Sequence, residues 1–133
     1  MSIKSMSKDQ AVYDLLKKGL DASSLRGKAT ANNIANINTK GYKRQYVTFE
    51  ENLKESMDKF PLKTTEEKHI TISNNLEEAK METDTSSSMR EDGNNVDIDN
   101  EMVNQAANTM MYNALISQVN NRIAMERYVI NGR

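Results

Sequence analysis

The residue types that carry most protein chemistry are sparse in this sequence and do not fall into a catalytic or metal-binding spacing. The 133-residue chain has no cysteine and one histidine, His69, so a zinc site would lack thiolates and a second imidazole. Acidic residues occur as neighbours at 50–51, 66–67 and 77–78, and adjacent side chains do not face each other on a helix. No serine has a base placed beside it by a recognisable motif. The sequence therefore predicts no enzyme, no cofactor and no metal site.

Two stretches superficially resemble ligand-binding loops but lack the residues that would bind the ligand. The stretch DGNNVDID at 92–99 lacks the order of acidic residues in an EF-hand, and position twelve counted from Asp92 is Val103 in place of glutamate. The stretch SSLRGKAT at 23–30 lacks the first glycine and the spacing of a phosphate-binding loop. We therefore expect neither calcium nor a nucleotide to bind there.

The charges are unevenly distributed, although the net charge is only −1. Residues 1–44 contain nine Lys/Arg and three Asp/Glu, residues 45–100 contain six and fourteen, and residues 101–133 contain three and two. A basic head can indicate a nucleic-acid partner, but these basic residues are dispersed, and Tyr13 is the only aromatic residue before Tyr42. We expect a solvated helix face and no nucleic-acid partner.

The sequence contains no signal for a membrane. No apolar run approaches the ~18 residues that a membrane-spanning helix needs, and no apolar stretch follows Met1 as in a cleaved signal peptide. The absence of cysteine fits a cytosolic chain, and it equally fits a secreted chain that dispenses with disulfides. We expect no direct insertion into a membrane.

Residues 7–41 have the pattern of one long helix, the first element that could position a functional side chain. Ser7 and Gln10 have the form of a capping box, and apolar or small residues then recur at helical spacing from Val12 to Ile37. Gly41 is the expected stop. Such a helix would have about 28–30 residues and a length of ~40–45 Å.

The C-terminal segment has the pattern of a second helix, also of about 30 residues. Asp97 or Asp99 is the expected cap, Glu101 falls in the first turn, and Asn131-Gly132 supplies the end signal. One apolar stripe follows helical spacing: Tyr112, Leu115, Ile116, Val119, Ile123 and Ile130. A second set forms a heptad seam that repeats at intervals of four and three with mostly small or polar residues: Val103, Ala107, Met110, Ala114, Ser117, Asn121, Ala124 and Tyr128.

Between the two helices the periodicity is weak. The stretch YKRQYVTFEENL at 42–53 alternates loosely, with Val47 and Phe49 on one side, and predicts a short extended piece before a partial helical turn. KHITISN at 68–74 could be a short strand. The polar stretch METDTSSSMREDGNN at 81–95 has the composition of a loop. We therefore expect little order from about residue 58 to residue 95.

These observations predict a mainly α protein whose two long terminal helices form an inter-subunit helical or coiled-coil packing. The irregular, partly disordered middle would contain at most short strands. Residues 1–41 and 96–133 would be the two helical segments of one core domain, joined by an acidic connection at 42–95. The hydrophobic fraction of 37% indicates a thin monomer core, and a helix with two stripes needs more than one partner helix. Assembly into a multi-subunit structure follows from this pattern.

The stretch ATANNIANINTKGYKR at 29–44 places four asparagines between Asn32 and Asn38. Buried between helices, such amides would fix register and orientation at a cost in stability. Alternatively, the helix frays into a turn and the asparagines bond their own backbone. The physical chemistry of the residues leaves both possibilities open.

The same stretch closely resembles the N-terminal signature of the flagellar rod, hook and related axial proteins, A-x-N-[IL]-A-N-x-x-T-x-G-[YF]-[KR]. The matching residues are Ala31, Asn33, Ile34, Ala35, Asn36, Thr39, Gly41, Tyr42 and Lys43. DGNNVDIDNEM at 92–102 and the ending RYVING resemble the basal-body rod members of this family, and the short chain fits them better than the hook proteins. One departure is Lys40, where the family commonly has proline.

The resemblance implies a structural subunit of the proximal rod of the bacterial flagellar basal body, in the periplasm. Family members leave the cytoplasm unfolded through the type III export apparatus, without a cleaved signal peptide, and assemble through both terminal helices. The implied partners are other flagellar rod proteins, the rod/export-gate junction and the export apparatus. The alternatives are a helical adaptor with a single partner and a nucleic-acid-binding module using the basic helix.

We expect the subunit interface to combine the signature motif with the apolar residues of the second helix. The expected interface residues are Ala31, Asn33, Ile34, Ala35, Asn36, Thr39, Gly41, Tyr42, Met110, Tyr112, Leu115, Ile116, Val119, Ile123, Tyr128 and Ile130.

Overall fold

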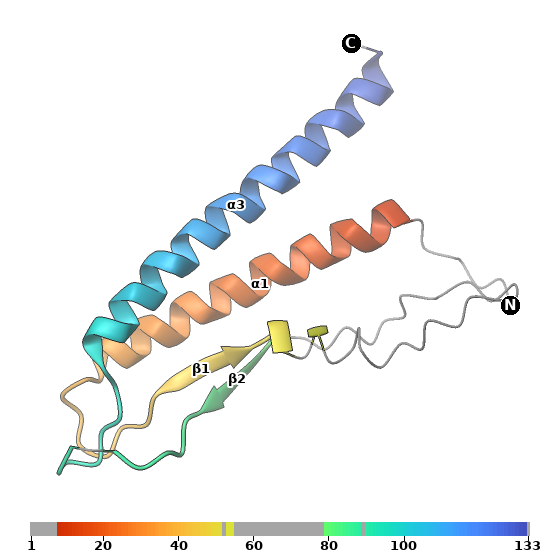
Figure 1. Ribbon diagram of the computed structural model, residues 1–133. Coiled ribbons are helices and arrows are strands. Elements are labelled where there is room, and N and C mark those ends of the chain that lie inside the picture. Colours follow the sequence, from red (N-terminus) through yellow and green to blue (C-terminus); the bar gives the residue numbers. More distant parts are fainter. Residues whose placement is uncertain (1–7, 52, 55–78, 89, 133) are drawn as a thin grey trace, which may run out of the picture.

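Two long helices and a small two-stranded antiparallel sheet are the main elements of the described part of the chain. The computed structural model describes residues 8–51, 53–54, 79–88 and 90–132. The elements follow in the order α1 (Lys8–Ala35), β1 (Gln45–Thr48), β2 (Lys80–Thr83) and α3 (Ile98–Asn131). Figure 1 shows α1 and α3 running in opposite directions, side by side where α1 ends and α3 begins and further apart toward Asn131. The expected mainly α class with short strands is confirmed.

Small residues on α1 let α3 approach closely. Ser23 is almost completely buried, and its hydroxyl donates to Asn108 Oδ1 at 2.9 Å while Asn108 Nδ2 donates to the Ser23 carbonyl, also at 2.9 Å. A Cβ atom placed on Gly27 would lie 3.5 Å from Asn108 Nδ2, and one on Gly19 would lie 3.5 Å from Leu115 Cδ1. Larger side chains on α3 therefore pack over glycine and serine on α1.

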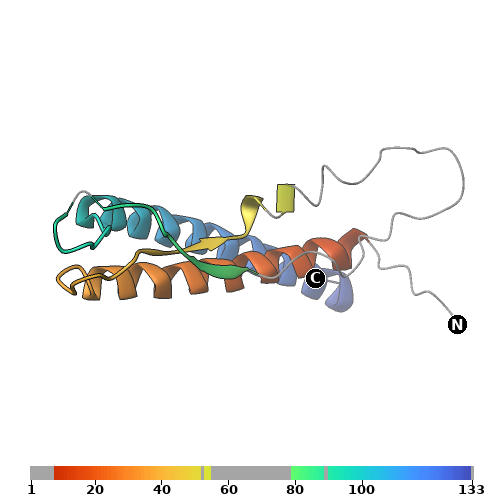
Figure 2. The same ribbon diagram turned by 90° about the horizontal axis from the view of Figure 1, so that it is seen from below.

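The two-stranded sheet lies along α1, below it in Figure 1 and across the front in Figure 2. β1 pairs antiparallel with β2, with Val47 opposite Met81. Val47 and Phe49 are buried, and Tyr46 and Thr48 on the alternate positions both donate hydroxyl hydrogen bonds to the Glu82 carboxylate. The extended piece predicted near residue 46 is confirmed, as is the helical turn after it, where the Leu53 N–H donates to the Phe49 carbonyl.

The expectation of little order up to residue 95 is wrong for its last part, because residues 80–83 form β2. All four β2 residues are exposed, and the sequence KMET contains one apolar residue, Met81, so the sequence has too little apolar pattern to predict a strand. It is held through backbone pairing with β1 and through the side chain of Glu82.

The helix ends agree only in part with the sequence pattern. α1 ends at Ala35, so the expected stop at Gly41 is wrong, and residues 36–41 form turns. Asp97 is the N-cap of α3 and accepts from the N–H groups of Asp99 and Asn100, as one of the two expected caps. Gly132 adopts the left-handed conformation (φ 65°), and its N–H donates to the Tyr128 carbonyl, which confirms the predicted end signal.

Some of the sequence-based expectations lie outside the described residues. These are the cap at Ser7, the possible strand at 68–74, His69, and the acidic pairs at 66–67 and 77–78.

Replacing Asn108 by alanine is expected to lower the free energy of unfolding by about 1–3 kcal/mol. The change removes both hydrogen bonds to Ser23 and leaves a buried hydroxyl and a buried carbonyl without these partners. The urea midpoint, followed by far-UV circular dichroism, measures the effect. Asn113→Ala, at an exposed position on the same helix, is the control, and equal midpoints for the two variants would contradict the role given to Asn108.

Candidate functional site: a polar latch at the joined ends of the helices

The described residues form many side-chain hydrogen bonds that join one element to another. Among them no group of three or more His, Cys, Asp or Glu side chains is placed to hold a metal ion. A shallow hollow near the end of α3, around Ala124 and Tyr128, is lined by side chains of α3 alone. The densest set of buried polar contacts lies where α1 ends, β1 begins and α3 begins.

Asn33 is the centre of this set, and its side chain is completely buried. Its Nδ2 donates to the Gln45 carbonyl at 2.7 Å and to Glu101 Oε2 at 3.0 Å. Its Oδ1 accepts from the Gln45 N–H at 2.8 Å and from the Tyr42 hydroxyl at 3.3 Å. An amide has two donor hydrogens and two acceptor lone pairs, so every hydrogen-bonding position of Asn33 is used. The side chain joins α1, the start of β1 and α3.

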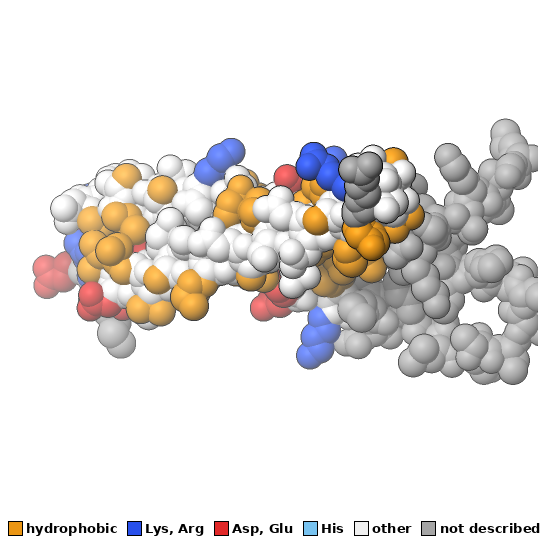
Figure 3. Space-filling model, turned by 90° about the horizontal axis from the view of Figure 1, so that it is seen from above, with side chains coloured by type: hydrophobic (Ala, Val, Ile, Leu, Met, Phe, Trp, Pro, Cys, Tyr) orange, Lys and Arg blue, Asp and Glu red, His pale blue; other side chains and the backbone are white. Residues whose placement is uncertain are grey.

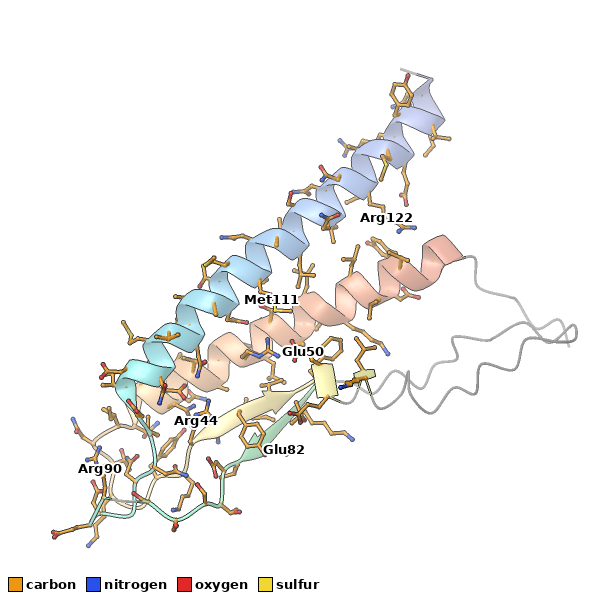
Figure 4. All side chains as sticks on the ribbon, viewed as in Figure 1. Arg44, Glu50, Glu82, Arg90, Met111 and Arg122 are labelled. Atoms are coloured by element: carbon orange, nitrogen blue, oxygen red, sulfur yellow. The ribbon has the colours of Figure 1, made fainter. Side chains whose placement is uncertain are left out.

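Glu101 brings a buried carboxylate to the same place. It is 1% exposed, and its Oε1 accepts from Arg44 Nε at 2.5 Å. The first turn of α3 also favours a negative charge, because unpaired N–H groups point out of that end. We call Asn33, Tyr42, Arg44 and Glu101 the polar latch; Arg44 lies beside the start of α3 in Figure 4.

The surroundings of Tyr42 in the polar latch also change the pKa of its hydroxyl. Partial burial raises the pKa of the Tyr42 hydroxyl above its usual value, and the negative charge of Glu101 raises it further. The raised pKa extends to more alkaline pH the range in which the hydroxyl is protonated and able to donate to Asn33.

A second buried amide, Asn94, holds the turn that follows α1. Its Nδ2 lies within hydrogen-bond distance of three carbonyls, those of Asn36 (3.0 Å), Ile37 (3.0 Å) and Thr39 (2.9 Å). Its Oδ1 accepts from the Val96 N–H at 2.8 Å. These carbonyls belong to the turn that follows the last residue of α1, and a side chain more than fifty residues further along the chain adds a donor to them. We call this contact the Asn94 cap.

The segment around Asn94 is bound to the α1 turn by further contacts. The Gly41 N–H donates to the Asp92 carbonyl at 2.8 Å, and Arg90 Nη1 donates to the Ile37 carbonyl at 3.2 Å. Gly41 and Gly93 both have positive φ (74° and 76°), and a Cβ atom on Gly93 would lie 3.8 Å from Gly41 Cα. The two turns thus pack backbone against backbone, and the positive φ values favour glycine at both positions.

The asparagine-rich stretch combines both alternatives left open by the sequence. Asn36 bonds its own backbone, since its Nδ2 donates to the Asn32 carbonyl at 2.8 Å and its Oδ1 accepts from the Thr39 hydroxyl at 3.2 Å. Asn33, in contrast, is the buried amide between elements. At the end of α1, Asn36 therefore stabilises the turn, whereas Asn33 joins the helix to β1 and α3.

The expected interface residues separate into two groups by exposure. Asn33 and Tyr42 have partners within the chain, and five apolar residues are half-buried: Ile34, Leu115, Ile116, Val119 and Ile123. Asn36 is also half-buried. The remaining residues are exposed: Ala31, Ala35, Thr39, Gly41, Met110, Tyr112, Tyr128 and Ile130. That any of these residues forms a subunit interface stays a prediction.

Sequence reasoning missed several residues that join the elements. Arg44, Asn94 and Asn95 were not singled out, although Asn95 Oδ1 accepts from the Arg44 N–H at 2.7 Å and Asn94 forms the cap. The sequence feature that could have indicated these asparagines is the pair Asn94-Asn95, which follows a glycine and ends two residues before the cap of α3. Such a pair is also typical of an ordinary loop, so only the fold distinguishes the two cases.

Two long helices joined by the polar latch define a mainly helical protein. Residues 17–43 match the family described as flagella basal body rod protein. The flagellar basal body rod protein FlgB of Bacillus subtilis is 30% identical over 117 residues, covering 88% of this chain and 91% of that protein. FlgB of Borreliella burgdorferi is 34% identical over 111 residues (77% and 82%), and that of Borrelia hermsii is 37% identical over 108 residues (74% and 80%).

The chain therefore belongs to the FlgB family of flagellar basal body rod proteins. Its role is structural, in the rod of the bacterial flagellar basal body, and serves motility.

Replacing Asn94 by alanine is expected to lower the free energy of unfolding by about 1–3 kcal/mol, because the carbonyls of the α1 turn and the buried Val96 N–H lose the Asn94 side chain as a partner. Thermal unfolding followed at 222 nm measures the change. Asn38→Ala, an exposed position in the same turn, is the control and should unfold like the parent chain. An unchanged melting temperature for Asn94→Ala would show that the cap does not stabilise the turn.

Stability is expected to fall as the pH drops from about 5 toward 3. The backbone N–H of Asn94 lowers the pKa of Asp92, and the backbone N–H of Ser86 lowers that of Asp84. A carboxylate with a lowered pKa stabilises the folded state above its unfolded pKa, and this contribution is lost as the pH falls through the folded value. Melting temperatures across this range should decline less steeply in Asp92→Asn than in the parent chain. Asp21→Asn, on the exposed side of α1, is the control, and parallel curves for Asp92→Asn and the parent would contradict the assignment.

Proposed function

We propose that this chain is a subunit of the proximal rod that assembles through α1 and α3. In this proposal the chain is exported from the cytoplasm by the flagellar type III apparatus, without removal of a signal peptide, and then joins the periplasmic rod. Its neighbours are other rod proteins and the junction between the rod and the export gate.

The observation that carries this proposal is the amount of apolar surface that α3 leaves uncovered. Met110 is 72% exposed, Tyr128 65%, Val129 80% and Ile130 81%. Exposed apolar residues gathered on one element are typical of a binding surface. An axial subunit would cover them with neighbouring helices, whereas a protein that works as a monomer gains nothing from them.

The order of contacts along the chain supports export before folding. The polar latch joins residues 33, 42 and 44 to residue 101, and the Asn94 cap joins residue 94 to the α1 turn. Neither contact can form until residues 94–101 have emerged from a channel. A chain whose long-range contacts close late stays open while it is threaded, because closing a loop costs entropy before contacts stabilise it.

The membrane plays no direct part in the proposal. No helix in the described part of the chain is sufficiently long and apolar to span a bilayer. Association with the rod therefore depends on contacts between proteins.

Ending the chain after Arg127 tests the proposal, since it removes the most exposed apolar residues of α3. We expect the shortened chain to be made at normal levels but to be absent from isolated basal bodies, and the cells to be non-motile. Immunoblots of whole cells and of basal bodies, with swimming assays, measure these outcomes.

A matched pair of point variants separates apolar contact from charge. Ile130→Asp should abolish swimming, whereas Asn131→Asp adds the same charge one residue further along an exposed turn and should leave swimming intact. Motile cells carrying Ile130→Asp, with the variant present in their basal bodies, would contradict assembly through the end of α3.

A further inference from the structure

The α1 turn, residues 36–42, is held by a distant segment of the chain. This segment, residues 90–94, is called the strap, and it lies beside the turn at the end of the helix pair in Figures 1 and 2. Asn94 Nδ2 contacts three carbonyls of the turn, the nearest at 2.9 Å, and the Gly41 N–H donates to the Asp92 carbonyl at 2.8 Å. The turn therefore depends on residues more than fifty positions further along the chain.

The buried amide of Asn94 is the main contact between the strap and the turn. Asn94 is completely buried, whereas the Arg90 side chain, which donates to the Ile37 carbonyl at 3.2 Å, is 45% exposed. Figure 3 shows acidic and basic side chains close together at this end of the molecule. Exposed ion pairs such as that of Arg90 and Asp92 contribute little, because water competes for both charges. The Asn94 cap therefore contributes most to holding the turn.

The strap is shaped by hydrogen bonds within its own sequence. The Gly93 N–H donates to the Arg90 carbonyl at 3.0 Å, and the Asn94 N–H donates to Asp92 Oδ1 at 3.1 Å. Asn94 Oδ1 accepts from the Val96 N–H at 2.8 Å, two residues further along. These bonds are local, as in an asparagine or aspartate turn, so the shape of the strap does not require the α1 turn.

The α1 turn has weaker bonds of its own. The Thr39 N–H makes one short bond, to the Asn36 carbonyl at 2.9 Å, but the Tyr42 N–H lies 3.2 Å from the Thr39 carbonyl. The Ile37 N–H lies 3.4 Å from the carbonyl three residues earlier, longer than the usual ~3.0 Å. The sequence NINTKG at 36–41 also contains asparagine and glycine, which adopt several turn conformations. Local chemistry therefore leaves this turn weakly fixed.

Lys40 stands at the position where a different residue would stiffen the turn. The bond from the Tyr42 N–H to the Thr39 carbonyl and the positive φ of Gly41 (74°) are typical of a type II turn with Lys40 second. Proline favours this second position, because its ring fixes φ near about −65°. The Lys40 N–H has no hydrogen-bond partner among the described residues, so proline at this position would remove no bond.

We propose that the strap is a conformational switch for the α1 turn, which opens when Asn94 leaves it and closes when Asn94 docks. The strap leads directly into the N-cap of α3 at Asp97, so docking of α3 brings the strap to the turn. Closing the turn then sets the direction in which the chain leaves α1 toward Arg44, whose side chain pairs with Glu101. The switch acts within one chain and does not depend on the proposed rod function.

Amide hydrogen exchange followed by NMR tests the switch, because two neighbouring amides report different contacts. The Gly41 N–H bonds to the strap, whereas the Tyr42 N–H bonds within the turn. In Asn94→Ala we expect both amides to exchange about tenfold faster or more than in the parent chain, as the turn opens locally. Adding Lys40→Pro should slow the Tyr42 amide again and leave the Gly41 amide fast, since proline fixes the turn but does not replace the strap.

Asn108→Ala is the matched control for a general loss of stability. It removes a buried amide between the helices, away from the strap, and should change the Tyr42 rate much less than Asn94→Ala does. Equal acceleration of the Tyr42 amide in the two variants would overturn the inference. A fast Gly41 amide with an unchanged Tyr42 amide in Asn94→Ala would show that the turn is formed without the strap, which also overturns it.

Arg90→Gln keeps the test decisive if Asn94→Ala does not fold. This variant removes the partly exposed contact to the Ile37 carbonyl and retains the buried amide of Asn94. We expect a smaller acceleration of the Tyr42 amide, which Lys40→Pro reverses. A Tyr42 rate that does not respond to Arg90→Gln, or that Lys40→Pro fails to slow in either background, would contradict the switch.

Discussion

The burial of the Glu101 carboxylate is the constraint on which the rest of the structure depends. A charge that is 1% exposed is tolerated only when it is paired and fully hydrogen-bonded. Arg44 and Asn33 meet this need from two other elements. Their positions fix where α1 ends, where β1 begins and how α3 lies against both, so one buried charge sets the arrangement of three elements.

The apolar core is too small to do this alone. The buried hydrophobic residues among the described ones are Ala22, Ala29, Val47, Phe49 and Val96, and two of the five are alanines. Polar contacts of defined direction therefore specify the fold where apolar bulk is lacking: the polar latch, the Asn94 cap, and the Ser23–Asn108 pair between the helices. Hydrogen bonds that are fully satisfied give such a site one geometry.

A fold that is specified by polar contacts and leaves apolar residues exposed suits the proposed subunit of a larger structure. The polar latch and the Asn94 cap lie at one end of the helix pair. Most of the large exposed apolar residues lie along α3. In the proposed rod, a subunit needs apolar surface for its neighbours more than it needs a large hydrophobic core of its own. In the proposed assembly the modest core and the exposed helix faces have one cause, since apolar residues that contact neighbouring subunits cannot also fill the core.

The sequence by itself determined both long helices, the end at Gly132 and the extended piece at Val47, and it limited the cap of α3 to Asp97 or Asp99, because each depends on local spacing and capping chemistry. It also indicated the family through the motif around Asn33 and Asn36. Only the tertiary structure decided that α1 ends at Ala35, that Asn94 caps the turn, that residues 80–83 pair as a strand, and that Asn33 meets Glu101. These features depend on partners 32 to 68 residues apart in the chain, and no local pattern records which distant donor will bond to a turn carbonyl or a buried carboxylate.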